Sequence, residues 1–255
     1  MIELVDVSFS YDKNSYLEDI SVSFEKEDIT TIIGPNGCGK STLLKLSSRI
    51  LAPKNGKVLL YGQDISEMKR KAFAREVSVL MQNNLSPPMT VENAVLSGRY
   101  PYQAFGQLLS KEDKAIAEEA MKVTCCDSFR GKEMNRLSGG ERQRVFLAMV
   151  LAQDTDIIFL DEPTTYLDIN VCYDIMELIA RLNREFGKTI ILVLHDLNLA
   201  LNYSHKMILM EKGKIISRDT PQNMAIGGSI GKVFGVSIKQ VSNEGRSFFY
   251  YNKIT

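Results

Sequence analysis

Residues 30–44 read TTIIGPNGCGKSTLL, and this stretch decides the fold. The β-branched run TTII at its start predicts a buried strand, and the spaced leucines at its end predict a helix. Between the two, Gly34 and Gly39 enclose four residues and are followed by Lys40 and Ser41, which is the spacing of a phosphate-binding loop. A strand, a glycine-rich turn and a helix in this order predict an α/β fold built around that loop.

The loop contains the residue types that binding a polyphosphate requires. Glycines allow backbone N–H groups to turn toward phosphate oxygens, and the start of the following helix adds unpaired donors and the positive end of its dipole. Lys40 would reach the β- and γ-phosphates, and the Ser41 hydroxyl would ligate Mg²⁺. The alternative is a glycine-rich turn with a chance lysine, which the flanking strand and helix disfavour. The chain is therefore predicted to bind a nucleoside triphosphate.

Composition narrows the class of protein further. The 255 residues include 31 basic and 31 acidic side chains, and this balance argues against a nucleic-acid binder. The four cysteines form no C-x-x-C pair, which indicates a reduced, cytosolic compartment. The N-terminus shows no signal peptide, and the longest apolar runs, of about five residues, are far shorter than the roughly 20 that span a bilayer. We expect a soluble protein that reaches a membrane only through a partner.

Apolar periodicity predicts the strands around the loop. Alternating residues near the N-terminus predict half-buried antiparallel strands, and the apolar runs at residues 157–160 and 189–194 predict fully buried parallel ones. A hairpin is expected about Lys212 and Gly213, and the sequence beyond Pro221 indicates little.

Capping residues predict the helices. Residues 86–136 read as a helical insertion, in which Thr90 and Ser110 begin helices and Gly98 ends the first of them. A long amphipathic helix before the second buried strand is expected to end at Gly187.

Three further features each allow two interpretations. Asp161 and Glu162 follow a buried strand, where α/β sheets place ligands, although paired carboxylates at a strand end are often only solvated. Ser138 and Glu141 have the spacing of a capping box, which by itself requires only a well-capped helix. Tyr11 is either an edge aromatic or a stacking surface for a nucleotide base, and the sequence does not decide between them.

Residues 137–143, LSGGERQ, resemble the signature motif of the ABC ATPases. The phosphate loop, this signature, the run from Ile158 to Glu162, the pair Leu167-Asp168 and His195 occur in the order of that family, over almost the whole chain. The resemblance implies an α/β P-loop NTPase core of the ABC type with an N-terminal antiparallel β subdomain and a helical insertion. It implies one domain over residues 1–255, with 1–85 and 137–255 as the RecA-like core and about 86–136 as the helical subdomain.

The resemblance also implies a role for each matching residue. The expected catalytic residues are Lys40, Gln82, Glu162 and His195. ATP is expected to contact Tyr11 with its base and otherwise the loop residues Gly34, Pro35, Asn36, Gly37, Cys38, Gly39, Lys40, Ser41 and Thr42. The expected Mg²⁺ ligands are Ser41, Gln82 and Asp161. A second copy, bound head to tail, would complete the site in trans with Ser138, Gly139, Gly140 and Asp168.

Glu141 stands where many relatives of this family have glutamine, and we expect its carboxylate to point back at its own helix, away from phosphate. His205 matches no motif and is expected to be structural.

The resemblance implies partners as well as residues. The region from Gln82 through Pro87 and Pro88 to Tyr102 resembles importer ATPases for ferric siderophores, haem or cobalamin, with ferric siderophores closest. In such proteins this region receives a helix of an integral membrane permease at the cytoplasmic face of the membrane, although Arg99 to Tyr102 could also be an ordinary surface turn. A substrate-binding protein is an indirect partner, and nucleic acid is not expected. The alternatives are another ABC transporter ATPase or, less favoured, a non-transport ABC ATPase.

Overall fold

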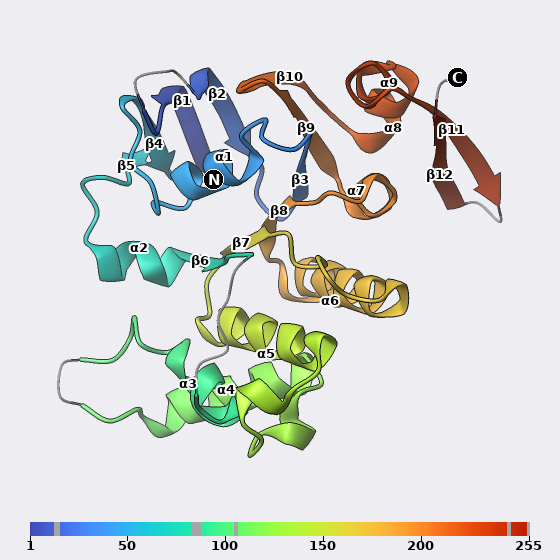
Figure 1. Cartoon of the computed structure of the whole chain (residues 1–255). Coiled ribbons are helices and arrows are strands. Elements are labelled where there is room, and N and C mark those ends of the chain that lie inside the picture. Colours follow the sequence, from blue (N-terminus) through green and yellow to red (C-terminus); the bar gives the residue numbers. More distant parts are fainter. Residues whose placement is uncertain (13–15, 83–87, 105–106, 244–245, 254–255) are drawn as a thin grey trace. The chain divides into compact units, whose positions relative to one another are not determined.

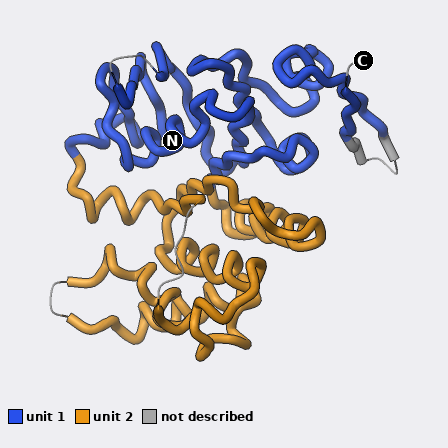
Figure 2. The backbone as a smooth tube through the Cα atoms, in the orientation of Figure 1, with its two compact units in different colours: residues 1–67, 189–255 blue, residues 68–188 orange. Residues whose placement is uncertain are grey.

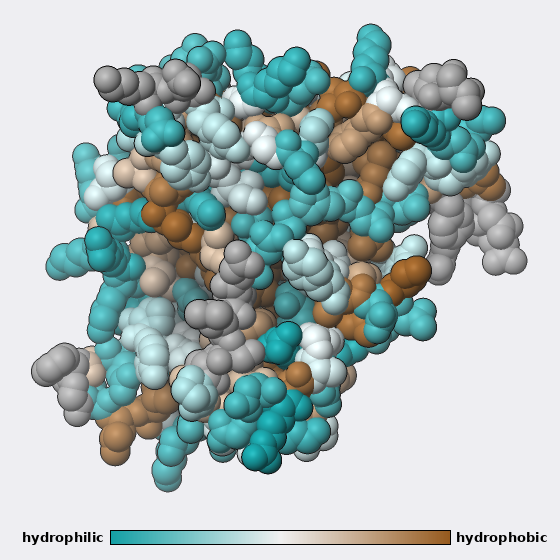
Figure 3. All heavy atoms as spheres, in the orientation of Figure 1, coloured by the Kyte–Doolittle hydropathy of each residue, from teal (hydrophilic) through white to brown (hydrophobic). Residues whose placement is uncertain are grey.

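The computed structural model describes residues 1–12, 16–82, 88–104, 107–243 and 246–253, and its backbone divides into two compact units (Figures 1 and 2). Unit 1 combines Met1–Glu67 with Thr189–Thr255, and unit 2 is Met68–Lys188. On the face in Figure 3, hydrophilic and near-neutral side chains cover much of the visible surface, and hydrophobic ones form smaller patches. The elements of each unit follow from where its apolar residues are buried.

The first sheet of unit 1 is antiparallel, as the alternating N-terminal pattern predicts. Its strand order is β2-β1-β4-β5. The strands are β1 (Ile2–Phe9), β2 (Leu17–Phe24), β4 (Asn55–Leu60) and β5 (Gln63–Asp64). The alternating buried positions along β1 and β2 are apolar, and the residues between them are exposed or half-buried, because successive side chains point to opposite faces of a sheet.

A second group of strands in unit 1 carries the phosphate loop. It contains β3 (Ile29–Ile33), β8 (Thr189–Val193), β9 (Lys206–Glu211) and β10 (Lys214–Asp219). β3 lies between β8 and β9 and is parallel to both, and all five residues of β3 are buried. β9 and β10 form the antiparallel hairpin predicted about Lys212 and Gly213. The loop after β3 leads into α1 (Lys40–Ser47), and α7 (Leu197–Tyr203) follows β8.

The end of unit 1 contains regular structure that the sequence did not indicate. It consists of α8 (Pro221–Ile226), α9 (Ser229–Phe234), β11 (Val236–Asn243) and β12 (Arg246–Lys253). β11 and β12 pair as an antiparallel hairpin (Figure 1).

Unit 2 is mainly helical around one parallel strand pair. The pair is β6 (Val77–Leu80) with β7 (Ile157–Asp161). The helices are α2 (Arg70–Glu76), α3 (Val91–Ser97), α4 (Lys111–Val123), η1 (Asp127–Phe129), η2 (Met134–Arg136), α5 (Gly139–Ala152) and α6 (Ile169–Phe186). In the part of the chain that the structure describes, no helix is both long and apolar enough to traverse a lipid bilayer.

The predicted helix limits are confirmed, and in one case the physical reason differs. Thr90 and Ser110 are the N-caps of α3 and α4, and Gly187 ends α6 with a φ of 63°. Gly98 also ends its helix, but its φ is −57°, so left-handed backbone is not the reason for a glycine there. A Cβ at Gly98 would lie 2.3 Å from the carbonyl oxygen of Met149, so the residue must be small because α5 approaches it closely.

Candidate functional site

The phosphate loop in unit 1 is tightly folded around its lysine. The Lys40 ammonium donates hydrogen bonds to the carbonyl oxygens of Gly34 (2.8 Å) and Pro35 (3.1 Å), and Lys40 is only 5% exposed. Gly34 has a φ of 152°, and a Cβ there would lie 2.2 Å from the carbonyl oxygen of Met210. Only glycine fits this position, because any Cβ would clash with the main chain at Met210.

The remaining loop residues divide into an exposed tip and a buried base. Asn36 and Gly37 are exposed, whereas Cys38 and Thr42 are buried. Burial raises the pKa of the Cys38 thiol above its usual value, which favours the protonated thiol. Ser41, at the second position of α1, is partly exposed.

Two tyrosines connect the N-terminal sheet to this loop. The hydroxyl of Tyr11 lies 3.2 Å from Oγ1 of Thr42, and the hydroxyl of Tyr16 donates to the carbonyl oxygen of Gly37 at 3.1 Å. Their ring centroids are 5.5 Å apart, and Tyr11 remains 58% exposed. Tyr11 therefore lies beside the phosphate loop and presents an aromatic surface to solvent. Tyr16 was not predicted, because no spacing rule places it near the loop.

His195 emerges beside the same loop. In the parallel register of β3 and β8, Ile32 pairs with Val193. Gly34 lies two residues after Ile32, and His195 lies two residues after Val193, so the two residues leave neighbouring strands at the same level. The carboxyl ends of adjacent parallel strands lie at one edge of the sheet, where α/β folds bind ligands. The His195 side chain is exposed at that edge.

His205, in contrast, has a structural role, as expected. Its Nδ1 accepts a hydrogen bond of 2.9 Å from the backbone N–H of Ile29, at the start of β3.

Unit 2 repeats this arrangement with the predicted carboxylates. Leu80 of β6 pairs with Leu160 of β7. Gln82 and Glu162 each lie two residues after one of these paired leucines. The Gln82 side-chain amide donates a 2.5 Å hydrogen bond to Oε2 of Glu162, and the hydroxyl of Thr165 donates to the same oxygen at 3.0 Å. Thr165 is a second contact that the sequence did not predict.

The two adjacent carboxylates have different surroundings. Asp161 is only 3% exposed at the end of β7, whereas Glu162 is half-buried and has a φ of 54°. Left-handed backbone is unfavourable for a residue with a Cβ, and such conformations gather at functional sites. This turn aims the Glu162 side chain at Gln82 instead of continuing the strand.

The predicted signature segment begins α5. Ser138 is its N-cap and forms a capping box with Glu141, whose carboxylate accepts the Ser138 N–H at 2.8 Å. This hydrogen bond lowers the pKa of Glu141 below its usual value. The expectation that Glu141 points back at its own helix is confirmed. Gly139 is exposed, and a Cβ at Gly140 would lie 2.7 Å from the side chain of Val171, so α5 starts close to α6. Asp168, the N-cap residue of α6, is exposed.

The segment from Arg99 to Tyr102 is not an ordinary surface turn. Arg99 is 4% exposed, forms a 2.9 Å ion pair with Asp113 and donates to the carbonyl oxygen of Ala152 at 2.9 Å. Its guanidinium lies 3.9 Å from the ring centroid of Tyr102, whose hydroxyl donates to the carbonyl oxygen of Asp154 at 3.2 Å. The segment is thus fastened to α4 and to the end of α5. Pro87, which belongs to the same predicted partner region, lies outside the described residues.

The predicted Mg²⁺ ligands have side chains of suitable chemistry. Ser41, Gln82 and Asp161 offer hydroxyl, amide and carboxylate oxygens, which Mg²⁺ prefers, and this ion usually takes few protein ligands together with phosphate oxygens. Among the residues that the structure describes, no group of three His, Cys, Asp or Glu side chains could hold a metal. The donor set therefore fits a phosphate-bound Mg²⁺.

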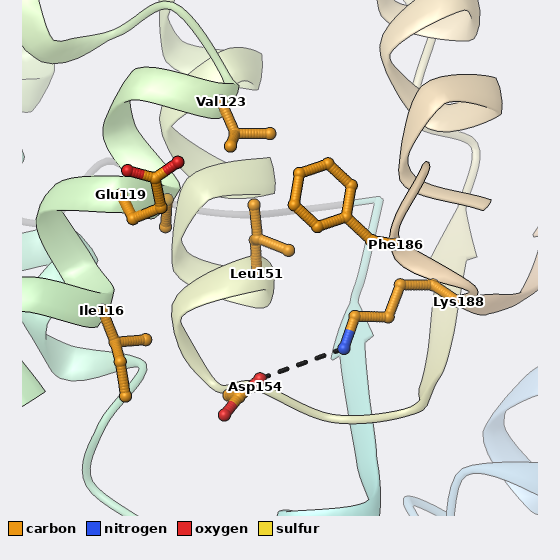
Figure 4. A pocket seen from close by; sticks show the side chains of 8 residues that line it. Ile116, Glu119, Val123, Leu151, Asp154, Phe186 and Lys188 are labelled. Atoms are coloured by element: carbon orange, nitrogen blue, oxygen red, sulfur yellow. Dashed lines mark ion pairs between the residues drawn. The ribbon is translucent and has the colours of Figure 1, made fainter. Parts of the chain in front are cut away.

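Unit 2 also contains a pocket of about 250 Å³ between α4, α5 and the end of α6. Apolar side chains such as Leu151 and Phe186 line it, and Lys188 and Asp154 form a 3.9 Å ion pair at one end (Figure 4). None of the predicted site residues lines this pocket.

Comparisons with known proteins all point to the same family. Residues 17–165 match the family described as ABC transporter. The chain is 40% identical over 232 residues, 91% of its length and 84% of the relative, to "Probable siderophore transport system ATP-binding protein YusV" of Bacillus subtilis (strain 168). It is 41% identical over 231 residues, 90% of its length and 85% of the relative, to "Ferric enterobactin transport ATP-binding protein FepC" of Escherichia coli (strain K12).

Solved structures agree with the sequence relatives. A dimeric post-hydrolysis state of the ATP-binding cassette MJ0796, bound to ADP and Pi, matches with a TM-score of 0.74 and 26% identity, over 87% of this chain and 99% of that one. The structure of cbiO1 from Clostridium perfringens, part of the ABC transporter complex cbiONQ, matches with a TM-score of 0.79 and 28% identity, over 91% of this chain and 93% of that one.

Proposed function

The chain belongs to the ABC transporter family, and we propose that it is the ATP-hydrolysing subunit of an importer that takes up a ferric siderophore. The observation that carries the ATPase part is the phosphate loop, whose lysine and glycines are already folded for a polyphosphate. The cargo part rests on relatives at 40% and 41% identity, which are named as siderophore and ferric enterobactin transport ATP-binding proteins. In this proposal residues 1–255 form one ATPase domain with a core of 1–85 and 137–255 and a helical subdomain near 86–136.

In the proposed site, the loop in unit 1 binds the nucleotide. Backbone N–H groups of residues 34–42 contact the phosphates, Lys40 stabilises the charge on the β- and γ-phosphates, and Tyr11 stacks on the adenine. The Lys40 ammonium already lies against the loop's own carbonyl oxygens, so it needs little rearrangement to face a phosphate at the loop's concave side. His195, at the carboxyl edge of β8, would hydrogen-bond the γ-phosphate.

The carboxylates in unit 2 supply the hydrolytic part. Glu162 orients and polarises the attacking water, and Gln82, which already donates to the carboxylate of Glu162, holds that carboxylate in position. Ser41, Gln82 and Asp161 would hold Mg²⁺, whose charge neutralises the phosphate oxygens during transfer. Asp161 suits a metal ligand because it is buried and acidic, and Glu162 suits a water contact because it is partly exposed.

The signature at the start of α5 is proposed to act on a neighbouring copy. Ser138, Gly139 and Gly140 lie at a helix N-terminus, where backbone N–H groups bind anions, and the first two are exposed. The solved cassette MJ0796 is dimeric in a state bound to ADP and Pi. We therefore place ATP between two copies, with Asp168 of each copy near the shared interface.

A complementation experiment tests this dimer directly. Lys40→Ala removes the phosphate lysine, and Ser138→Arg removes the cap acceptor and blocks the helix tip, so each variant alone should hydrolyse almost no ATP. When the two chains are mixed, one of the two sites in the mixed dimer pairs an intact loop with an intact signature, and activity should return. Failure of the mixture to recover would refute sharing of the site between copies. Ser110→Arg is the matched control, because Ser110 caps α4 in an equivalent capping box.

The transport role requires a membrane partner and a cargo protein. We propose that a permease binds the region from Gln82 to Tyr102 at the cytoplasmic face of the membrane, and that a substrate-binding protein delivers the iron chelate from outside. The test is uptake of a radiolabelled ferric siderophore into cells that carry this chain, its permease and its binding protein. Uptake should be lost with Lys40→Ala, and haem or cobalamin should not compete. Competition by either compound would transfer the assignment to that cargo.

A further inference from the structure

Lys54 lies directly before β4, and its side chain is hydrogen-bonded to both sequence neighbours of Tyr11. Its ammonium donates a 2.6 Å hydrogen bond to the hydroxyl of Ser10 and a 3.3 Å hydrogen bond to the carbonyl oxygen of Asp12. Ser10 is only 9% exposed, so the shorter of these charge-assisted bonds is sheltered from water. The Lys54 side chain thus holds the side chain of the residue before Tyr11 and the backbone of the residue after it.

The main chain of Lys54 also binds the segment that contains Tyr11. Its backbone N–H donates to the carbonyl oxygen of Ser8 at 2.9 Å, and the next residue, Asn55, pairs with Ser8 in the β1–β4 register. The lysine is therefore fixed to the sheet at its base, and its ammonium reaches past the end of β1. Lys54 thus contacts three residues of the segment from Ser8 to Asp12 from a distant part of the sequence.

Tyr11 is restrained from its other side by different contacts. Its hydroxyl lies 3.2 Å from Oγ1 of Thr42 in α1, and its ring packs at 89° to the ring of Phe9 with centroids 4.9 Å apart. These contacts fix the two ends of the side chain, but neither fixes the backbone after Tyr11. Lys54 supplies that restraint, because it is bonded to Asp12.

We propose that Lys54 is a positioning residue for the base-stacking Tyr11 and that it contributes to adenine-nucleotide affinity without touching the nucleotide. The inference rests on the proposed stacking role of Tyr11. A ring that is already held in place loses little freedom when a base stacks on it, whereas a ring on a loose segment must first be ordered. The phosphate loop has its own restraints in Lys40 and Gly34, so Lys54 should affect binding of the base and leave binding of the phosphates unchanged.

The experiment compares two ligands in the full-length chain with Mg²⁺ present. The non-hydrolysable imido analogue of ATP reports base and phosphate binding together, and inorganic tripolyphosphate reports the phosphates alone. Lys54→Met should raise the dissociation constant of the ATP analogue about fivefold, the effect expected for the loss of one such restraint, and change that of tripolyphosphate less than about twofold. Lys54→Arg, which keeps the charge and the donors, should restore affinity for the analogue.

Two further variants separate positioning from simpler causes. Lys57→Met removes the same charge from an exposed position in β4 and should bind both ligands like the unmodified chain. In a chain that already carries Tyr11→Ala, adding Lys54→Met should weaken the analogue no further, because no ring remains to be positioned. Thermal melting of each variant checks that the fold is intact.

The outcomes distinguish this inference from its premise. If Tyr11→Ala binds the analogue as the unmodified chain does, the stacking role is wrong and the inference falls with it. If Tyr11→Ala weakens binding but Lys54→Met does not, only the positioning role is wrong. Equal weakening of tripolyphosphate and the analogue by Lys54→Met, or a full additive effect in the Tyr11→Ala chain, would also overturn the positioning role.

Discussion

Replacing Arg99 with methionine should destabilise the chain far more than the same replacement of Arg144, which forms an ion pair of almost the same length. Arg99 pairs with Asp113 at 2.9 Å, and Arg144 pairs with Asp174 at 3.0 Å. The side chains of the first pair are 5% and 15% exposed, and those of the second are 24% and 62% exposed. Because the distances are nearly equal, the burial of the Arg99 pair and its additional contacts should decide the difference in stability.

The magnitude follows from what each substitution leaves behind. Without Arg99, the carboxylate of Asp113 keeps its bonds to Ser110 but loses its buried cation, and the carbonyl oxygen of Ala152 loses a donor. Breaking a buried pair in this way costs about 3 kcal/mol, the lower end of the usual range because Ser110 remains, and the lost contact with the Tyr102 ring adds about 1 kcal/mol. The exposed Arg144 pair should contribute about 0–1 kcal/mol.

Urea unfolding of the isolated chain, followed by circular dichroism, measures both effects. Arg99→Met should lower the unfolding midpoint by roughly 1 M, taking a denaturant slope of about 3 kcal/mol/M, and Arg144→Met should shift it by less than about 0.3 M. Asp113→Asn in the Arg99→Met chain should recover part of the loss, because the uncompensated charge is then removed. Equal shifts for the two arginine variants would refute the argument that burial sets the cost.

Three other predictions use matched residues of the same chain. Glu162→Gln should nearly abolish ATP hydrolysis while preserving ATP binding. Glu141→Gln, which keeps its capping hydrogen bond, should leave hydrolysis unchanged. Steady-state phosphate release measures both variants, and full activity of Glu162→Gln would remove Glu162 from the mechanism. The Ser138 N–H lowers the pKa of Glu141 in the folded state, so this carboxylate stabilises the chain above its ordinary pKa of 4.5 and the contribution is lost as the pH falls through the lowered folded value. Glu141→Gln should lack this pH-dependent contribution in chemical unfolding, and an unchanged pH profile would contradict it. Gly98→Ala should cost about 2 kcal/mol in thermal unfolding because its Cβ would clash with the Met149 carbonyl, and Gly131→Ala, whose Cβ would meet nothing within 4 Å among the described residues, should cost little.

Local features of this protein could be predicted from its sequence. Thr90, Ser110 and Ser138 each cap a helix through a residue three positions later, so the pattern lies within one turn and needs no tertiary information. The phosphate loop is local for the same reason, since its shape depends on glycines at fixed spacing. These are the features that the structure confirms in detail.

Features that depend on strand neighbours could not be predicted from residue spacing. The bond between Gln82 and Glu162 exists because β6 and β7 pair with Leu80 opposite Leu160, and no local pattern specifies that register. Tyr16 reaches the phosphate loop, and Lys54 reaches Ser10, through contacts between residues that lie 21 and 44 positions apart in the sequence. The C-terminal hairpin was missed for another reason, because β11 reads VSIKQVSN with only three apolar residues and gives a weak strand pattern.

The predicted permease-binding region illustrates how burial changes the meaning of a sequence motif. Arg99 and Tyr102 looked available for a partner, but the Arg99 guanidinium is committed to Asp113 and Ala152, and the Tyr102 hydroxyl is committed to Asp154. A partner that bound the Arg99 guanidinium would have to break its bonds and leave the Asp113 carboxylate or the Ala152 carbonyl oxygen unpaired, which costs more than a new surface contact returns. Tyr100, between them, is 60% exposed. The two flanking residues therefore hold the segment rigid, and in the proposed complex the exposed Tyr100 would be free to contact the permease.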